Sequence, residues 1–330
     1  MSAYFPDRET IQTVLSLATR APSVHNTQPW RWRVGSESLH LYSDRGLHLP
    51  RTDPDGRDLI LSCGMALHHC SVALAALGWQ SKLHRLPNPA ELEHLAAIEV
   101  YRHPANEIDI TLAAAIPRRH TDRRRYSAWP VPANYIALLG ARAARTGIVL
   151  RQMESLPELR HIVAQSVRRH AADPDYLTEL TTWSGRYASL AGVPARNTPD
   201  PDPTAPLPPR LFAGPMMAQP DDTEPVEDNA VVLALGTKDD SVLARLRAGE
   251  ATSLMLLSAT ALGLANCPVT EPLEVTETRE ALQVEVFGLS AVPQMLLRVG
   301  WAPVNADAVP ATPRRPLGDV VEYLDRSAFG

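Results

Sequence analysis

Two long apolar stretches of this chain share one pattern. Residues 64–78 and 249–263 each open with glycine and close with Leu-Gly, so the two glycines of each stretch lie fourteen positions apart. A helix that is apolar all round must be buried on every side. Two such helices would bury each other if they packed across a pseudo-twofold interface. The repeat predicts two related halves, residues 1–116 and 117–330.

Each apolar stretch is followed by a short strand, a loop with proline and a β-rich segment, at residues 98–102 in one case and 295–301 in the other. A capping signature at 155–158 predicts the start of a further helix. Other periodic segments predict helices at 8–19 and 133–145 and strands at 30–34, 39–43 and 148–151. The pattern favours an α+β fold in which helices pack on a mostly antiparallel sheet in each half.

The composition changes abruptly at residues 190–228. This insert has ten prolines in 39 residues and seven acidic side chains against two arginines, so neither a helix nor a paired strand is expected. One interpretation is a disordered linker. The other, which we favour, is a lid over a pocket, because the insert carries an apolar cluster that a solvated linker would not need. The cluster comprises Leu207, Leu211, Phe212, Met216 and Met217.

Composition also narrows the functional classes. Of the 330 residues 45% are hydrophobic, and the net charge of -5 argues against a nucleic-acid binder. No apolar run follows Met1, and the uncharged stretch 251–270 is too polar for a membrane span. The cysteines Cys63, Cys70 and Cys267 lack CxxC spacing. We expect a cytoplasmic protein without disulfides.

The sequence His68-His69-Cys70 is the densest group of potential metal ligands. Adjacent residues of a helix point about 100° apart, and no fourth ligand follows at a usual spacing. We expect no metal site.

Two distant basic segments offer donors for a phosphate. Residues 119–123 read Arg-His-Thr-Asp-Arg, and residues 313–316 read Pro-Arg-Arg-Pro. Guanidinium groups bind phosphate oxygens through paired hydrogen bonds, and a hydroxyl adds another donor. Taken alone, residues 118–125 favour a solvated basic loop, with a nucleic-acid patch as the other interpretation.

Residues 21–30, Ala-Pro-Ser-Val-His-Asn-Thr-Gln-Pro-Trp, carry a resemblance to a known family. They resemble the APSxxNxQPW loop of FMN-dependent nitroreductases, although a rigid turn between helix and strand is the alternative interpretation. Residues 119–123 resemble the RxSxR segment with which that family grips the FMN phosphate. Residues 262–271 resemble the family segment beneath the flavin, with Glu271 where glycine is usual. The two loops occur in inverted order here, which implies a fused pseudo-dimer with one flavin site.

Residues 52–67 and 119–124 narrow the resemblance to the Acg branch of the nitroreductase superfamily, over nearly the whole chain. This branch implies a duplicated nitroreductase fold in one polypeptide, one FMN and a lid. The resemblance implies FMN contacts from Ser23, Val24, Asn26, Arg119, His120, Thr121, Arg123, Pro268, Val269, Thr270, Arg314 and Arg315.

The activity implied by this resemblance is NAD(P)H-dependent hydride transfer through FMN to nitroaromatic or quinone-like acceptors. FMN carries that chemistry, so no catalytic residue is expected. The alternative is an FMN storage protein whose lid keeps the nicotinamide away. We expect FMN, NAD(P)H and a small aromatic acceptor as partners, no nucleic acid or membrane, and a monomeric chain.

Overall fold

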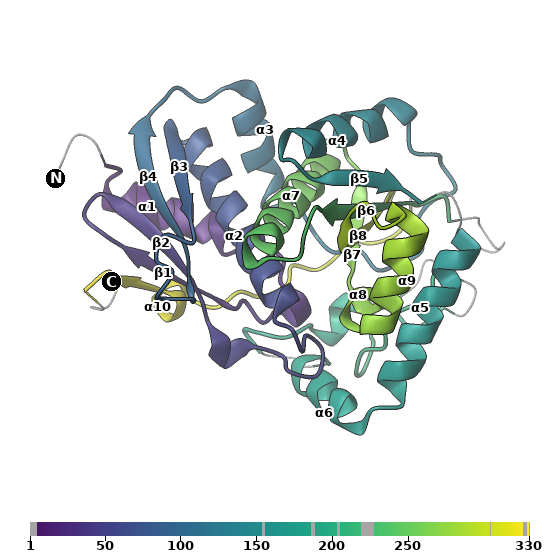
Figure 1. Ribbon diagram of the computed structural model, residues 1–330. Helices are drawn as coiled ribbons and strands as arrows, with labels where there is room; N and C mark the ends of the chain where they lie inside the picture. Colours follow the sequence, from purple (N-terminus) through teal and green to yellow (C-terminus); the bar gives the residue numbers. More distant parts are fainter. Residues whose placement is uncertain are drawn as a thin grey trace.

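The computed structural model describes residues 5–153, 156–185, 189–202, 205–218, 228–303, 305–325 and 329. Two β-sheets lie on either side of a central pair of long helices, α2 and α7 (Figure 1). This arrangement confirms the predicted α+β class. Ser155, which opens the predicted capping signature, lies outside the described residues.

The helices and strands lie close to the positions predicted from the periodic patterns of the sequence. The helices are α1 Arg8–Ala18, α2 Arg57–Ala76, α3 Glu107–Ala115, α4 Ala133–Arg145, α5 Leu156–Ala171, α6 Pro174–Trp183, α7 Val242–Ala261, α8 Glu271–Glu274, α9 Thr276–Phe287 and α10 Leu317–Val320. The strands are β1 Trp30–Val34, β2 Ser38–Ser43, β3 Trp79–Arg85, β4 His94–Arg102, β5 Val149–Gln152, β6 Val231–Thr237, β7 Ala265–Val269, β8 Val292–Gly300 and β9 Val321–Tyr323.

The first sheet has the strand order β3-β4-β2-β1-β9. Along β1 the side chains of Trp30, Trp32 and Val34 are buried and Arg31 is exposed, which is the alternation of a sheet with one covered face. Its last strand comes from the C-terminal region, where β9 pairs in parallel with β1 (Figure 1). Residues 321–323 therefore belong to the first sheet, although the prediction placed them in the second half. The division at residues 116 and 117 otherwise stays a prediction.

The second sheet has the order β5-β6-β8-β7 and is antiparallel throughout. Strand β6 is buried on both faces. Leu233 and Leu235 belong to the core that contains the long helices, whereas Val232 and Ala234 pack with residues of α5 and α9. The sheet is thus covered on both faces, and one hydrophobic core continues from it through α7 and α2 into the first sheet.

The contact between α2 and α7 is reciprocal. A Cβ atom on Gly64 would overlap the carbonyl oxygen of Leu246 and lie 3.0 Å from the Gly249 Cα. A Cβ atom on Gly249 would overlap the carbonyl oxygen of Leu61 and lie 2.9 Å from the Gly64 Cα. Each glycine thus meets the carbonyl three residues before its counterpart, which is the pattern of a twofold contact.

Helix α2 is long and apolar enough to cross a membrane, judged by length and composition. However, 78% of its most apolar window is buried inside the protein, and its first residues, Arg57 and Asp58, are buried ionisable groups. Such burial is typical of the core helix of a folded domain.

Substituting Gly64 with alanine tests the helix contact. We expect G64A to lower the free energy of unfolding by about 3 kcal/mol, because the new methyl group must push two backbones apart. Urea unfolding measures the effect. In helix α4 a Cβ on Gly140 meets nothing within 4 Å, so G140A should instead stabilise the protein by about 0.5–1 kcal/mol. Equal effects of G64A and G140A on the free energy of unfolding would contradict the close approach of α2 and α7.

Candidate functional site

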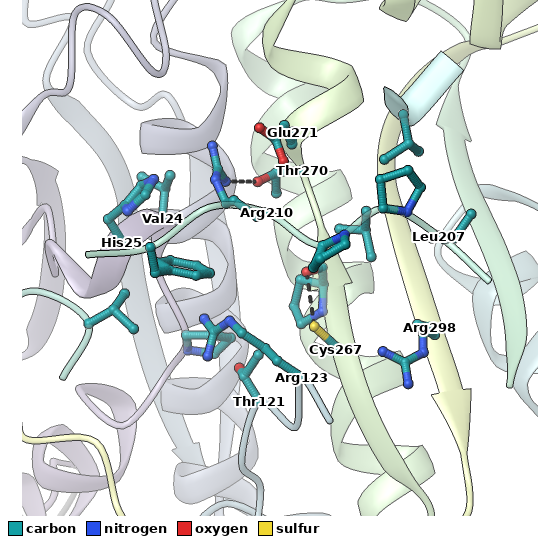
Figure 2. A pocket seen from close by; sticks show the side chains of 18 of the residues that line it. Val24, His25, Thr121, Arg123, Leu207, Arg210, Cys267, Thr270, Glu271 and Arg298 are labelled. Carbon is teal, nitrogen blue, oxygen red and sulfur yellow. Dashed lines mark hydrogen bonds between the residues drawn. The ribbon is translucent and has the colours of Figure 1, made fainter. Parts of the chain in front are cut away.

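A cavity of about 170 Å³ lies where the loop after α1, the start of α2, the β7–α8 connection and the insert 190–228 meet (Figure 2). It gathers residues from segments that are far apart in the sequence. Seven of the predicted site residues line it: Ser23, Val24, Thr121, Arg123, Pro268, Val269 and Thr270. The other five, Asn26, His120, Arg119, Arg314 and Arg315, lie outside its lining.

The loop between α1 and β1 has an unusual backbone. His25, Asn26 and Gln28 have φ values of 44°, 54° and 54°, a left-handed conformation that costs energy for residues other than glycine. Hydrogen bonds hold the loop in this shape: Gln28 N donates to Ser23 Oγ at 2.9 Å, and Val24 N donates to Ser62 Oγ of α2 at 3.2 Å. Because the loop is fixed to α2, Val24 and His25 are held at the cavity.

Asn26 and Gln28 join this loop to two other segments. Asn26 Nδ2 donates to the carbonyls of Gly192 at 3.0 Å and Pro313 at 3.2 Å. Gln28 Nε2 donates to the Leu190 carbonyl at 2.9 Å, and its Oε1 accepts from Arg315 N at 2.8 Å. The side-chain amides of Asn26 and Gln28 thus bind other segments of the protein, and a contact of Asn26 with FMN stays a prediction.

The basic segment 119–123 lies beside β7. Asp122 N donates to the Asn266 carbonyl at 3.0 Å, and Thr121 forms a bridge with the same residue. Asp122 also binds Arg124 through both carboxylate oxygens, at 3.0 and 2.8 Å. These bonds fix Thr121 and Arg123 at the cavity next to residues 267–270.

Arg119 is buried beside three partly exposed residues, and together they form a group that we call the cation cluster: Arg20, Arg119, His120 and Arg314. Arg119 is 6% exposed, and its Nε and Nη1 have no hydrogen-bond partner. Burial, then the positive charges of Arg20 and Arg123, lower the pKa of Arg119 to about 10. Among the described residues no carboxylate forms an ion pair with the three arginines. The cluster therefore holds uncompensated positive charge.

Arg314 has a different role from Arg119. Its guanidinium donates to the carbonyls of Thr19 and Arg20 at 3.0 Å each and to Asn26 Oδ1 at 3.1 Å. It further donates to the carbonyls of Ala21, Thr312 and Pro313. Burial, together with the charges of Arg119 and Arg20, lowers its pKa to about 9. Arg314 thus closes the loop 19–26 onto the C-terminal segment.

The insert closes the other side of the cavity. Arg123 donates to the Asn197 carbonyl at 3.2 Å, and its guanidinium lies 4.9 Å from the ring centre of Phe212. Arg210 forms an ion pair with Glu274 and donates to Thr270 Oγ1 at 3.0 Å (Figure 2). The described residues of the insert therefore pack onto the rest of the protein, as a lid requires.

Only part of the apolar cluster predicted for the lid faces the cavity. Leu207 and Phe212 line it. Leu211 and Met216 are instead exposed, the latter by 58%, and Met217 is buried beside Pro199 outside the lining. The turns imposed by the prolines point these side chains in different directions, which the sequence alone did not indicate.

Several cavity residues were missed by the sequence analysis, among them Asp58, Arg210 and Arg298. Arg298 binds Asp228 at 2.8 Å and lies 4.0 Å from the ring centre of Tyr126. A single charge within the apolar strand β8 was a signal that could have revealed it. Glu271, at the position where the family usually has glycine, is buried, and its Oε1 accepts a hydrogen bond from His170 Nδ1 at 3.0 Å.

This chain belongs to the nitroreductase superfamily. It is 62% identical over 323 residues to "Putative NAD(P)H nitroreductase Rv3131" of Mycobacterium tuberculosis (strain ATCC 25618 / H37Rv), with 98% of this chain and 94% of the relative covered. It is 35% identical to "Putative NAD(P)H nitroreductase acg" of the same strain, with 94% and 95% covered. These relatives confirm the family and the resemblance to the Acg branch.

Two further comparisons add little to this. No protein-family model matches the chain. A solved nitroreductase with bound FMN from Desulfitobacterium hafniense DCB-2 is 12% identical, with a TM-score of 0.42 over 65% of this chain and 98% of that one.

The hydrogen bonds of Arg314 predict a structural effect. We expect R314A to lower the free energy of unfolding by about 2–4 kcal/mol, because several buried carbonyls lose their donor at once. Thermal and urea unfolding measure it. Arg118 is exposed and donates only to the Ala114 carbonyl of its own segment, so R118A should change stability by less than about 0.5 kcal/mol. A near-neutral R314A would show that the loop does not depend on this side chain.

Proposed function

We propose that this protein is an FMN-dependent NAD(P)H oxidoreductase that reduces nitroaromatic or quinone-like compounds. The observation that carries the proposal is that Nε and Nη1 of the buried Arg119, in the cation cluster, have no hydrogen-bond partner. Buried charged groups are normally paired, and a phosphate dianion is a partner that suits three clustered arginines. The names of both relatives support the NAD(P)H-dependent activity.

The residues at hand fit the rest of an FMN molecule. The phosphate end would meet Arg119, His120 and Arg20, with Thr121 and Arg123 between the cluster and the cavity. The ring would lie between Ser23 and Val24 on one side and residues 268–270 on the other. When bound, FMN supplies hydride transfer, and the chain contributes binding, orientation and the exclusion of water.

The repeat supports a duplicated nitroreductase fold within one chain. The reciprocal contact of Gly64 and Gly249 is the contact expected between two related halves. Since the cation cluster lies beside this cavity, we propose one FMN per chain. The covalent link between the halves replaces an association of subunits, and the protein would therefore be a monomer.

A specific observation favours a second candidate function, FMN storage. The insert is fixed over the cavity by the ion pairs Arg210–Glu274 and Arg125–Asp202. A closed lid would occupy the space in which a nicotinamide must stack on the flavin, so reduction requires the lid to move.

Removing one guanidinium tests the phosphate site. We expect R119A to weaken FMN binding by about 1.5–3 kcal/mol and to purify largely without flavin, because a charge-assisted pair of hydrogen bonds is lost. Equilibrium dialysis of FMN measures the affinity. The matched control is the exposed neighbour Arg118, where R118A should bind FMN like the wild type. Unchanged FMN affinity in both R119A and R123A would place the phosphate elsewhere.

Shortening the insert distinguishes reductase from storage protein. We expect the wild-type flavin to be reduced slowly by NADPH, and a variant with residues 196–224 replaced by a Gly-Ser linker to be reduced several-fold faster while keeping its flavin. Anaerobic stopped-flow absorbance measures both rates. Equal and fast reduction would show that the insert does not gate the site. Slow reduction in both proteins would favour storage.

A further inference from the structure

Two side chains in the cavity carry polar atoms that the fold leaves without partners. Both ring nitrogens of His25 and the Oδ2 atom of Asp58 are buried and make no hydrogen bond. The residues are 6% and 5% exposed, and both line the cavity. Buried polar groups are nearly always hydrogen-bonded, so a ligand that enters the cavity is the natural partner for these atoms.

His25 offers one donor and one acceptor. Burial, and then the positive charges of Arg210 and Arg123, lower its pKa well below the ordinary value, so the imidazole is neutral at neutral pH. Its ring lies 5.9 Å from that of Phe212, centre to centre, at an angle of 58°. The left-handed backbone at His25 holds the ring at the cavity (Figure 2). This side chain can therefore bind a neutral, aromatic ligand without an ionic partner.

Asp58, at the start of α2, is a carboxyl group without a cation of its own among the described residues. Its neighbour Arg57 is bound to Asp240 and donates to the Pro293 carbonyl at 3.0 Å and to Gln294 Oε1 at 2.9 Å. The charged groups that face Asp58 are Asp53 from the loop before α2, Glu274 from α8, Arg57 from α2 and Arg210 from the insert.

Burial is the main cause that raises the pKa of Asp58 well above its ordinary value, and the negative charges of Asp53 and Glu274 add to it. The opposing effects of Arg57 and Arg210 are smaller. These effects favour the protonated form of Asp58, which presents an O–H donor until the pH rises through the raised pKa.

We propose that Asp58 and His25 form the subsite for the oxygen atoms of the electron acceptor, and that Asp58 supplies the proton that accompanies hydride transfer to it. The inference rests on the proposed reductase function and deepens it. The acceptor class is a neutral aromatic compound with a nitro group, whose oxygens accept hydrogen bonds from the Asp58 hydroxyl and the imidazole N–H.

The reaction step is balanced with one proton from Asp58. A nitro group takes one hydride, which carries two electrons from the NAD(P)H-reduced flavin, and one proton from the Asp58 O–H bond. One N–O bond breaks, the oxygen leaves as water, and a nitroso group remains. Asp58 becomes a carboxylate and regains its proton from solvent.

Binding experiments separate hydrogen bonding from apolar contact. Nitrobenzene is titrated into the FMN-loaded, oxidised protein, with toluene as the matched probe that has no oxygen, and the flavin absorbance reports occupancy. We expect H25F, which keeps a ring and loses both nitrogens, to bind nitrobenzene roughly tenfold more weakly and toluene as before. Equal loss for both probes, or loss for neither, would overturn the role of His25.

Turnover of nitrobenzene tests the proton donor. D58N keeps the size of the side chain and an N–H donor but cannot transfer a proton. For D58N we expect an unchanged KM for nitrobenzene and a kcat roughly tenfold lower than that of the wild type. The fall of kcat at alkaline pH, which reports loss of the Asp58 proton, should disappear. D53N, which removes a negative neighbour outside the cavity lining, should keep kcat at neutral pH and shift the alkaline limb to lower pH. An unchanged kcat and limb in D58N would exclude Asp58 as the donor.

An infrared measurement makes the test independent of turnover and of whether D58N folds well. With aspartate labelled by ¹³C, the wild type should show a protonated-carboxyl band at pH 7 that shifts when nitrobenzene binds. D58N that retains FMN should lack this band. A wild type without such a band would overturn the proposal, whereas a protein that binds no FMN at all would instead refute the proposed function.

Discussion

The backbone contact between Gly64 and Gly249 is the constraint on which the rest of the structure depends. Because neither helix has a side chain there, α2 and α7 approach until their backbones touch. That approach allows a single hydrophobic core to include both sheets. It also sets the start of α2 opposite the β7–α8 connection, and the cavity forms between these two segments. A wider helix spacing would separate the two walls of the site.

The fold was predictable from the sequence where it depends on local periodicity. The helix Ala133–Arg145 and the strand Trp30–Val34 begin and end where their apolar patterns do. Strand β9 was missed because three residues carry no periodic signal, and only pairing with β1 defines them as a strand. The repeated glycines predicted the helix contact correctly, because two helices can approach this closely only where neither has a side chain.

The site was predictable only where one segment supplies a motif. Loop 22–28 and residues 119–123 were recognisable, since their spacing follows from one local backbone shape. Asp58 and Arg210 were not, because they reach the cavity through tertiary packing of α2 and of the insert. Asn26 shows a second limit: its position was predicted, but the sequence could not indicate that its amide binds other segments of the chain.

The route of the C-terminal segment has a consequence for how this protein acquires its ligand site. After the second sheet is complete, the chain crosses back to the first, where Arg314 binds the carbonyls of residues 19–21 and β9 joins β1 (Figure 1). Contacts between residues almost 300 positions apart are made late, since a long loop must close before they form. During synthesis, the loop at residues 19–28 therefore reaches its final conformation only after nearly the whole chain has been made. The part of the cavity wall that this loop supplies is therefore fixed only at the last stage of folding.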